Sequence, residues 1–174
     1  MNILITGSTS TIGRSIVKEF APNNSLFLLY RNSTKDDLSK IKENALSLGS
    51  DSVTLIDGDL GELLDKYSNE IVNIDYDLFI NVASSTSALN DDDILPEKHL
   101  YHTNVDLTNP LLVAGKLLDE KVKQGNNANL TMVFISSILT KIDHQNHNIY
   151  TSYKILQSEY IKRLKTVTEF SLIK

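Results

Sequence analysis

The first 20 residues constrain the fold more than any other stretch of the chain. Asn2 to Thr6 is the kind of apolar run that forms a strand buried on both faces of a parallel sheet. Gly7 ends this run, because glycine accepts any backbone dihedral, and Gly13 is expected to open a helix. The apolar stripe of that helix is Ile12, Ile16, Val17 and Phe20. The first amides of a helix lack intrahelical partners and lie at the positive end of its dipole, so this turn predicts an anion site that a pyrophosphate would fit.

A glycine turn alone is also compatible with a tight turn that binds nothing, so the rest of the chain must decide. Strand-like and helix-like runs alternate throughout. The expected strands are Asn2–Thr6, Ser25–Tyr30, Val53–Ile56, Tyr76–Val82, Leu130–Ile135 and Phe170–Ile173. Helical patterns cover Thr34–Leu48 with Thr34 as N-cap, a weak helix at Glu62–Tyr67, a stretch ending at Lys123, and Ile149–Val167. This alternation predicts one α/β domain over residues 1–174, with a parallel sheet and helices on both faces.

Composition excludes several functional classes. The chain has 174 residues, of which 41% are hydrophobic, enough for a core without cross-links. It contains no cysteine, which excludes disulfides and thiolate metal sites and fits a reducing compartment, so we expect a cytoplasmic protein. We expect no membrane partner, because there is no basic leader and no run approaches the roughly 20 apolar residues of a membrane span. A net charge of −5 with scattered lysines argues against nucleic acid as a partner.

Ligands of doubly wound sheets bind beyond the carboxyl ends of the strands, so the residues found there are informative. They are Thr6–Gly13 (T-G-S-T-S-T-I-G), Arg31, Asp59-Leu60, Asn81-Val82-Ala83-Ser84 and Ser136-Ser137. Further along, Tyr150 and Lys154 are one helical turn apart and share a helix face. A phenol has a pKa near ~10, and a nearby ammonium lowers this pKa. The pair therefore predicts a general acid at Tyr150, with an ordinary surface pair as the alternative.

Taken in order, these motifs resemble the common branch of the short-chain dehydrogenase/reductase family along the whole chain. The family's T-G-x-x-x-G-x-G corresponds to Thr6–Gly13, its adenine contact to Asp59-Leu60, its N-N-A-G to Asn81–Ser84, its serine to Ser137 and its Y-x-x-x-K to Tyr150 and Lys154. The resemblance implies a Rossmann-type doubly wound sheet of six strands in the order 3-2-1-4-5-6. It also implies an oxidoreductase that transfers hydride between a nicotinamide and a carbonyl or alcohol. Tyr150 would protonate the carbonyl oxygen, Ser137 would hold that oxygen, and Lys154 would also contact the ribose.

The resemblance carries a set of candidate site residues. The cofactor-binding set is Gly7, Ser8, Thr9, Ser10, Thr11, Ile12, Gly13, Arg31, Asp59, Leu60, Asn81, Ala83, Tyr150 and Lys154, and the catalytic set is Ser137, Tyr150, Lys154 and Asn104. Asn104 fits the local T-N-V wording, whereas counting back from Pro110 selects Asp106; of the two, Asn104 is the predicted residue. NADP(H) is favoured over NAD(H), because Tyr30 stands where NAD-preferring members carry an acid and Arg31 can pair with a 2′-phosphate.

Several positions depart from the family pattern. Thr11 replaces the middle glycine of the common branch, and Ser10 stands where the sugar-nucleotide branch has glycine, so side chains crowd the pyrophosphate. Val82 and Ser84 replace the second Asn and the Gly of N-N-A-G. Members usually continue past the sixth strand, so we expect a fragment or a shortened protein with a pocket open on one side. Two alternatives follow: an epimerase or dehydratase of the extended branch, and a degenerate, non-catalytic dinucleotide-binding protein.

The resemblance also implies a homodimer or homotetramer, since family members pair through two long helices. These correspond to Leu107–Lys123 and Ile149–Val167, the second presenting Tyr153, Leu156, Tyr160, Leu164 and Val167. His144 and His147 have H-x-x-H spacing, but without a third ligand they predict no metal site.

Overall fold

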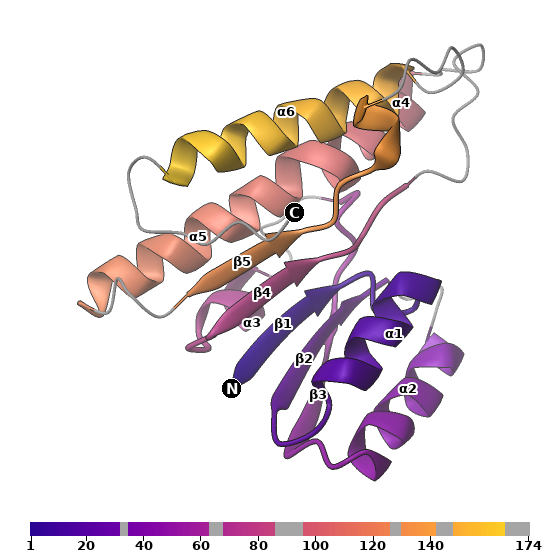
Figure 1. Ribbon diagram of the computed structural model, residues 1–174, viewed down its shortest axis with the longest axis vertical. Coiled ribbons are helices and arrows are strands. Elements are labelled where there is room, and N and C mark those ends of the chain that lie inside the picture. The colour runs from indigo at the N-terminus through magenta and orange to yellow at the C-terminus, as the bar shows by residue number, and fades with distance from the viewer. Residues whose placement is uncertain (32–34, 63–67, 86–95, 126–129, 142–147, 166–174) are drawn as a thin grey trace.

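The computed structural model describes residues 1–31, 35–62, 68–85, 96–125, 130–141 and 148–165. Its strands are β1 (Asn2–Thr6), β2 (Ser25–Tyr30), β3 (Ser52–Asp57), β4 (Leu78–Asn81) and β5 (Thr131–Phe134). They form one sheet in the order β3-β2-β1-β4-β5, with every neighbouring pair parallel (Figure 1). The predicted order of these five strands is confirmed, whereas the predicted strand Phe170–Ile173 lies outside the described residues. β4 is shorter than the predicted Tyr76–Val82.

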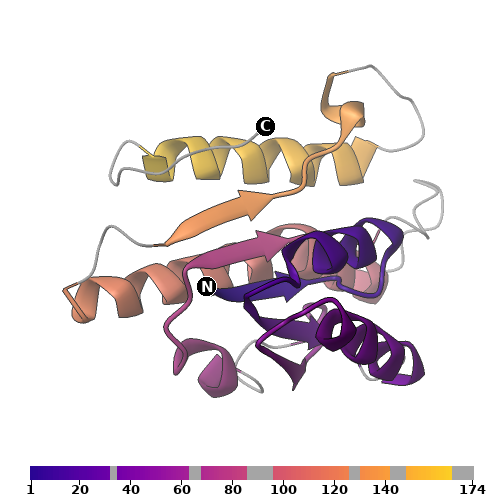
Figure 2. The same ribbon diagram turned by 60° about the horizontal axis from the view of Figure 1, so that its bottom comes forward.

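Helices connect the strands and cover the sheet (Figure 2). They are α1 (Thr11–Phe20), α2 (Lys35–Ser47), α3 (Ser68–Val72), α4 (Pro96–Thr103), a π-helical turn η5 (Asn104–Thr108), α5 (Asn109–Lys123), a 3₁₀ turn η6 (Ile138–Lys141) and α6 (Asn148–Lys165). The sequence prediction missed α3, and residues 63–67 of the predicted weak helix lie outside the described part, as does Thr34. No described helix combines the length and apolar character needed to cross a membrane.

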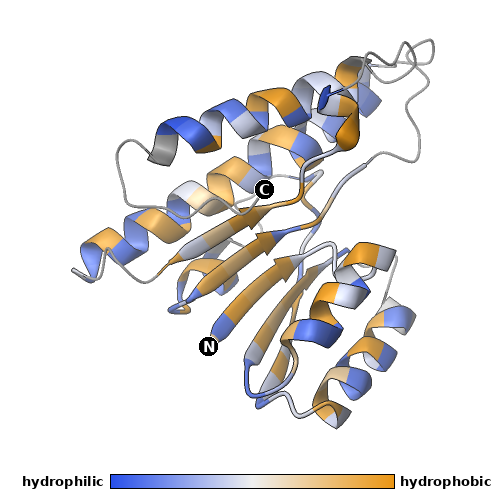
Figure 3. Ribbon diagram, in the orientation of Figure 1, coloured by the Kyte–Doolittle hydropathy of each residue, from blue (hydrophilic) through white to orange (hydrophobic). Residues whose placement is uncertain are grey.

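Each face of the sheet has its own core, because side chains alternate between faces along a strand. Ile3 and Ile5 pack toward α1 and α2 together with Val17 and Ile41. Leu4, between them, packs with residues of α3 and α5, among them Val113. Figure 3 shows the resulting pattern, with apolar strands and helices that are apolar on one side. Burial on both faces explains why the strands read as nearly continuous apolar runs.

The strand order reverses between β1 and β4, and this point is fixed by buried polar side chains. Thr6 and Asn81 are register partners at the carboxyl ends of these two strands. The Thr6 hydroxyl donates to Asn81 Oδ1 at 2.7 Å and accepts from the backbone N–H groups of Val82 and Ala83, each at 3.3 Å. These bonds hold the chain segments that leave the two strands close together, at the position where doubly wound sheets bind ligands.

Candidate active site

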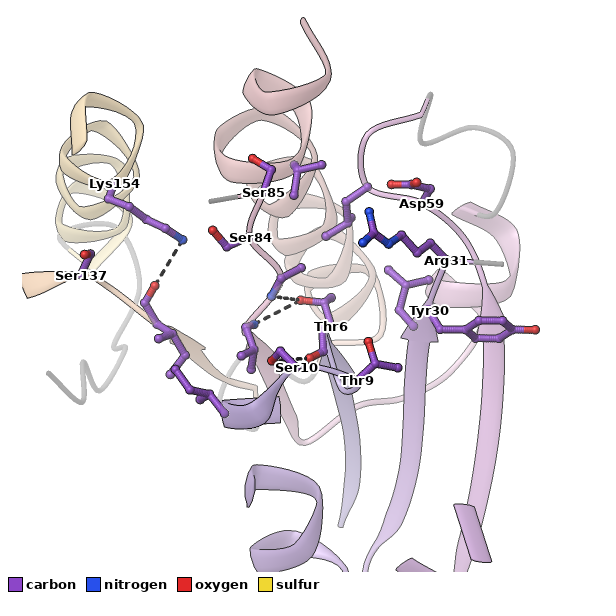
Figure 4. Close-up of a pocket in the computed structure, with 18 of the residues that line it drawn as sticks. Thr6, Thr9, Ser10, Tyr30, Arg31, Asp59, Ser84, Ser85, Ser137 and Lys154 are labelled. Carbon is purple, nitrogen blue, oxygen red and sulfur yellow. Dashed lines mark hydrogen bonds between the residues drawn. The ribbon is translucent and has the colours of Figure 1, made fainter. Parts of the chain in front are cut away.

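A cleft of about 680 Å³ opens at the reversal point, over the carboxyl ends of the strands (Figure 4). Its volume lies within the ~300–1,000 Å³ range of small-molecule sites. The predicted residues that line it are Gly7, Thr9, Ser10, Thr11, Ile12, Arg31, Asp59, Leu60, Ala83, Ser137, Tyr150 and Lys154. Ser8, Gly13, Asn81 and Asn104 are not among the lining residues. The fold thus brings residues from both ends of the chain to one cavity.

Both glycines of the first turn are required by close backbone contacts. Gly7 has a φ of 68°, and a Cβ there would lie 2.6 Å from the amide nitrogen of Ala83. A Cβ on Gly13 would lie 2.1 Å from the carbonyl oxygen of Gly7. A side chain fits at neither position. The turn therefore packs closely against the segment after β4, and its residues Gly7, Thr9 and Ser10 line the cleft.

Ser10 accounts for one departure from the family pattern. It is the N-cap of α1: its hydroxyl accepts from the Gly13 N–H at 3.0 Å and donates to the Gly7 carbonyl at 2.9 Å. The helix therefore begins at Thr11, two residues before the predicted start at Gly13. Thr11 is exposed at the first helical position, where its side chain borders the cleft. Because Ser10 engages the Gly13 N–H, the first-turn amides placed toward an anion in the cleft are those of Thr11 and Ile12.

Arg31 and Asp59 lie at the opposite end of the cleft from Lys154 (Figure 4). Arg31 follows β2 and extends toward Asp59 in the loop after β3, whereas the ring of Tyr30 turns away. Asp59 Oδ1 accepts from the Gly61 N–H at 2.8 Å, which fixes the carboxylate at the rim. This end of the cleft therefore combines one cation and one anion.

Tyr150, on the first turn of α6, lies at the other end beside Ser137. Burial raises the pKa of the Tyr150 phenol, and hydrogen bonds with Ser137 and Ser84 act in the opposite direction. The prediction that Lys154 lowers this pKa is not supported: the Lys154 ammonium lies 5.8 Å from the ring centroid, and burial dominates. The phenol is therefore protonated at neutral pH and is contacted by two hydroxyl groups.

Lys154 is almost completely buried, and its Nζ donates to the Ile135 carbonyl at 3.3 Å. Burial lowers the pKa of Lys154, while the nearby Asp106 carboxylate raises it. A buried ammonium needs such compensation, because desolvation disfavours its charged form.

Asp106, and not Asn104, is the residue of the π-helical turn that faces the catalytic end. The Asp106 carboxylate is fully buried and accepts from the Ser84 hydroxyl at 2.8 Å and from the Ser85 hydroxyl. Asn104 instead donates its amide to the Gly61 carbonyl at 3.1 Å, in the loop after β3. The choice of Asn104 over Asp106 is therefore corrected: Asn104 stabilises a loop, and Asp106 acts on Tyr150 and Lys154 through its charge.

Tyr153 and Gln157, on α6 with Tyr150 and Lys154, lie outside the cleft. The Tyr153 hydroxyl contacts Thr103 at 2.7 Å and His99 at 3.1 Å, and Gln157 donates to the backbone oxygen of Asp106, so neither belongs to the cleft. Sequence reasoning missed Ser85, which lines the cleft four residues after the end of β4; a hydroxyl this close to the carboxyl end of a parallel strand is a usable signal. It also missed Tyr101 on α4, which lines the cleft and which no local motif marks. His144 and His147 lie outside the described residues.

The doubly wound sheet, the glycine turn and the cleft at the reversal point define the class of dinucleotide-binding α/β proteins. Within that class, the chain belongs to the short chain dehydrogenase family, whose sequence model matches residues 1–167. The chain is thereby an oxidoreductase of a family that uses nicotinamide dinucleotides. Comparison with curated proteins returns no match.

Solved structures share the fold at low sequence identity. A short-chain dehydrogenase from Sphingobium yanoikuyae in complex with NADPH superposes with a TM-score of 0.81 at 18% identity, covering 98% of this chain and 69% of that one. Serine dehydrogenase from Escherichia coli gives 0.79 at 16% identity, covering 99% and 80%. A 3-oxoacyl-[acyl-carrier protein] reductase from Brucella melitensis gives 0.80 at 21% identity, covering 95% and 63%.

Proposed function

We propose that the chain is an NADP(H)-dependent reductase of carbonyl compounds, or dehydrogenase of the corresponding alcohols. The observation that carries the proposal is that Ser137, Tyr150 and Lys154 line the same cleft as the glycine turn. Tyr150 and Lys154 come from α6 and Ser137 from the segment between β5 and η6. Together they supply a proton donor, a hydroxyl and an ammonium at one end of the cleft, a combination that suits carbonyl reduction.

The residues present fit a dinucleotide. Thr11 and Ile12, the first residues of α1, line the cleft, so their backbone amides are placed to meet a pyrophosphate. Arg31 stands at the rim after β2, where its guanidinium can pair with a 2′-phosphate, which favours NADP(H). When bound, the dinucleotide supplies the hydride, and the protein supplies position and electrostatics.

Tyr150 is the proposed general acid. As the carbonyl carbon of the substrate gains hydride, its oxygen takes the proton of the Tyr150 hydroxyl, and the phenolate is reprotonated from solvent. Because burial raises the pKa of Tyr150, the phenol carries its proton at neutral pH. The hydrogen bonds with Ser137 and Ser84 stabilise the phenolate that forms. Ser137 also holds the substrate oxygen.

Lys154 is the proposed contact to the ribose. Its ammonium is buried beside the cleft and keeps its charge with help from Asp106, which raises the pKa of Lys154 against the effect of burial. A charged donor at this point can orient the ribose through a charge-assisted hydrogen bond.

The test is carbonyl reduction followed by NADPH absorbance over a panel of aldehydes and ketones, with Tyr150→Phe and Tyr153→Phe as a matched pair. Tyr150→Phe should lower turnover by about 10²–10⁴-fold while NADPH still binds. Tyr153→Phe removes a hydroxyl three residues further along α6, outside the cleft, and should leave turnover unchanged. If Tyr150→Phe is as active as the parent, Tyr150 is not the acid. Dinucleotide binding without turnover on any substrate would favour the non-catalytic alternative.

We also propose a homodimer through α5 and α6. Leu112, Val122, Ile155, Leu156 and Tyr160 of these helices are 43–53% exposed, an apolar surface that a second copy could cover. Tyr153, predicted to belong to this surface, is buried, and the side chains of Leu164 and Val167 lie outside the described residues. Light scattering at micromolar concentration tests this, and a mass of only 19.5 kDa would contradict it.

A further inference from the structure

Tyr101 of α4 lies at the Arg31 end of the cleft, in close contact with the loop that follows β3. A Cβ on Gly61 would lie 1.8 Å from Cε2 of the Tyr101 ring, so the ring packs directly on the backbone of this loop. Tyr101 is only partly buried and lines the cleft together with Arg31 and Asp59. The contact places a phenol hydroxyl between the residues that follow β2 and those that follow β3.

The Tyr101 hydroxyl contacts both the Arg31 guanidinium and the Asp59 carboxylate at this end of the cleft. It lies 3.3 Å from Arg31 Nη1 and 3.2 Å from each carboxylate oxygen of Asp59. A guanidinium only donates and a carboxylate only accepts, so the phenol accepts from Arg31 and donates to Asp59. The three side chains come from the end of β2, the loop after β3 and α4, and the Tyr101 hydroxyl links them.

The contact between Arg31 Nη1 and the Tyr101 hydroxyl, at 3.3 Å, is longer than the usual N–H···O hydrogen bond, and it restricts where the guanidinium lies at the rim of the cleft. Tyr101 engages Nη1, one of the two terminal nitrogens of the Arg31 guanidinium, and Arg31 lines the cleft. A long side chain that is already oriented loses less conformational entropy when it binds a ligand.

We propose that Tyr101 is a specificity-determining residue for the 2′-phosphate of the cofactor, acting as a positioning residue that orients Arg31. This inference rests on the proposed function, because it presumes that the dinucleotide binds in this cleft with its adenosine end at Arg31. Tyr101 contributes to the preference for the phosphorylated ribose, and a variant without its hydroxyl discriminates less between the two cofactors.

The test uses isothermal titration of the whole chain with 2′,5′-ADP and with 5′-ADP, two probes that report the adenosine end and need no turnover. Tyr101→Phe keeps the ring on Gly61 and removes the hydroxyl. It should weaken 2′,5′-ADP by roughly 3- to 10-fold and leave 5′-ADP nearly unchanged. Tyr153→Phe removes a phenol hydroxyl that contacts Thr103 and His99, and should change neither affinity.

A double-mutant cycle shows whether Tyr101 acts through Arg31. In an Arg31→Ala background, Tyr101→Phe should cause no further loss of 2′,5′-ADP affinity. An unchanged ratio of the two affinities in Tyr101→Phe overturns the inference, as does an equal loss for both probes or a full additional loss in the Arg31→Ala background. These results leave the proposed reductase intact. Failure of the parent chain to bind either probe would refute the cofactor site itself, and this inference with it.

Discussion

Replacing Gly7 by alanine tests the contact that shapes the cleft, the approach of the first turn to the segment after β4. At Gly7 a new Cβ would lie 2.6 Å from the Ala83 nitrogen and 2.7 Å from the Ala83 Cα, both backbone atoms that cannot rotate away. Gly125, at the end of α5, provides a matched control. Its φ of 70° is nearly the same as the 68° of Gly7, but a Cβ there meets nothing within 4 Å.

Gly7→Ala and Gly125→Ala share the free-energy cost of a left-handed backbone and differ in the collision that the new Cβ makes. The left-handed backbone costs an alanine about 1–2 kcal/mol at either position. The reduced entropy of the unfolded chain is also the same for both and cancels in the comparison. Only Gly7→Ala adds the collision with Ala83, and overpacking of this kind costs about 1–3 kcal/mol. We expect Gly7→Ala to lower the free energy of unfolding by roughly 2–5 kcal/mol and Gly125→Ala by roughly 1–2 kcal/mol.

Urea denaturation followed by far-UV circular dichroism measures both variants, and the midpoints convert to free energies if the slopes are equal. Titration of NADPH into the folded variants gives a second readout, because displacement of the Gly7 turn would also displace the first amides of α1. Equal destabilisation by Gly7→Ala and Gly125→Ala would refute the close approach of the turn to Ala83.

Three further predictions follow from local geometry. Gly115→Ala, inside α5 where a Cβ meets nothing within 4 Å, should raise the urea midpoint by stabilising the helix by about 1 kcal/mol; an unchanged or lower midpoint would contradict this. Ser10→Ala removes the N-cap of α1 and should cost about 1 kcal/mol in the same assay, whereas no loss would mean that the cap is not needed. Burial raises the pKa of Tyr150 most, and the Asp106 charge raises it further; Asp106→Asn removes that charge, so the phenol should ionise at lower pH. The alkaline limb of the pH–rate profile for carbonyl reduction should then move to lower pH, and an unmoved limb would argue against this electrostatic role.

Much of the candidate site was predictable, because it is encoded at the ends of strands. A buried parallel strand is a short apolar run, and the residue that follows it necessarily lies at one edge of the sheet. The positions of Gly7, Arg31, Asp59, Ala83 and Ser137 around one cleft therefore follow from strand ends alone. The details inside the turn were less predictable: Ser10, which stands where the sugar-nucleotide branch has glycine, caps the helix with its hydroxyl.

The choice between Asn104 and Asp106 shows where a short local motif misleads. The T-N-V wording selected Asn104, whereas counting back from Pro110 selected Asp106, the residue whose carboxylate accepts from Ser84. A π-helical turn contains one extra residue, which shifts the faces of the following helix by roughly 100°. The structure has such a turn at Asn104–Thr108, and it directs Asp106 toward Ser84 while Asn104 reaches the loop after β3. The local T-N-V wording does not show which face of the helix a residue occupies, because the π-helical turn sets that face.

The sequence by itself determined the alternation of parallel strands and helices and the motifs along the cleft, because these depend on apolar periodicity and on residues next in the chain to strand ends. The order of the first five strands followed from the family resemblance that these motifs carry. Tertiary structure alone decided the direction of the Tyr150 pKa, the role of Asp106 and the position of Tyr101 between Arg31 and Asp59. Each of these depends on burial or on contacts between segments far apart in sequence: 42 residues separate Tyr101 from Asp59, and 70 separate it from Arg31. Local patterns carry no information about such distances, because packing sets them.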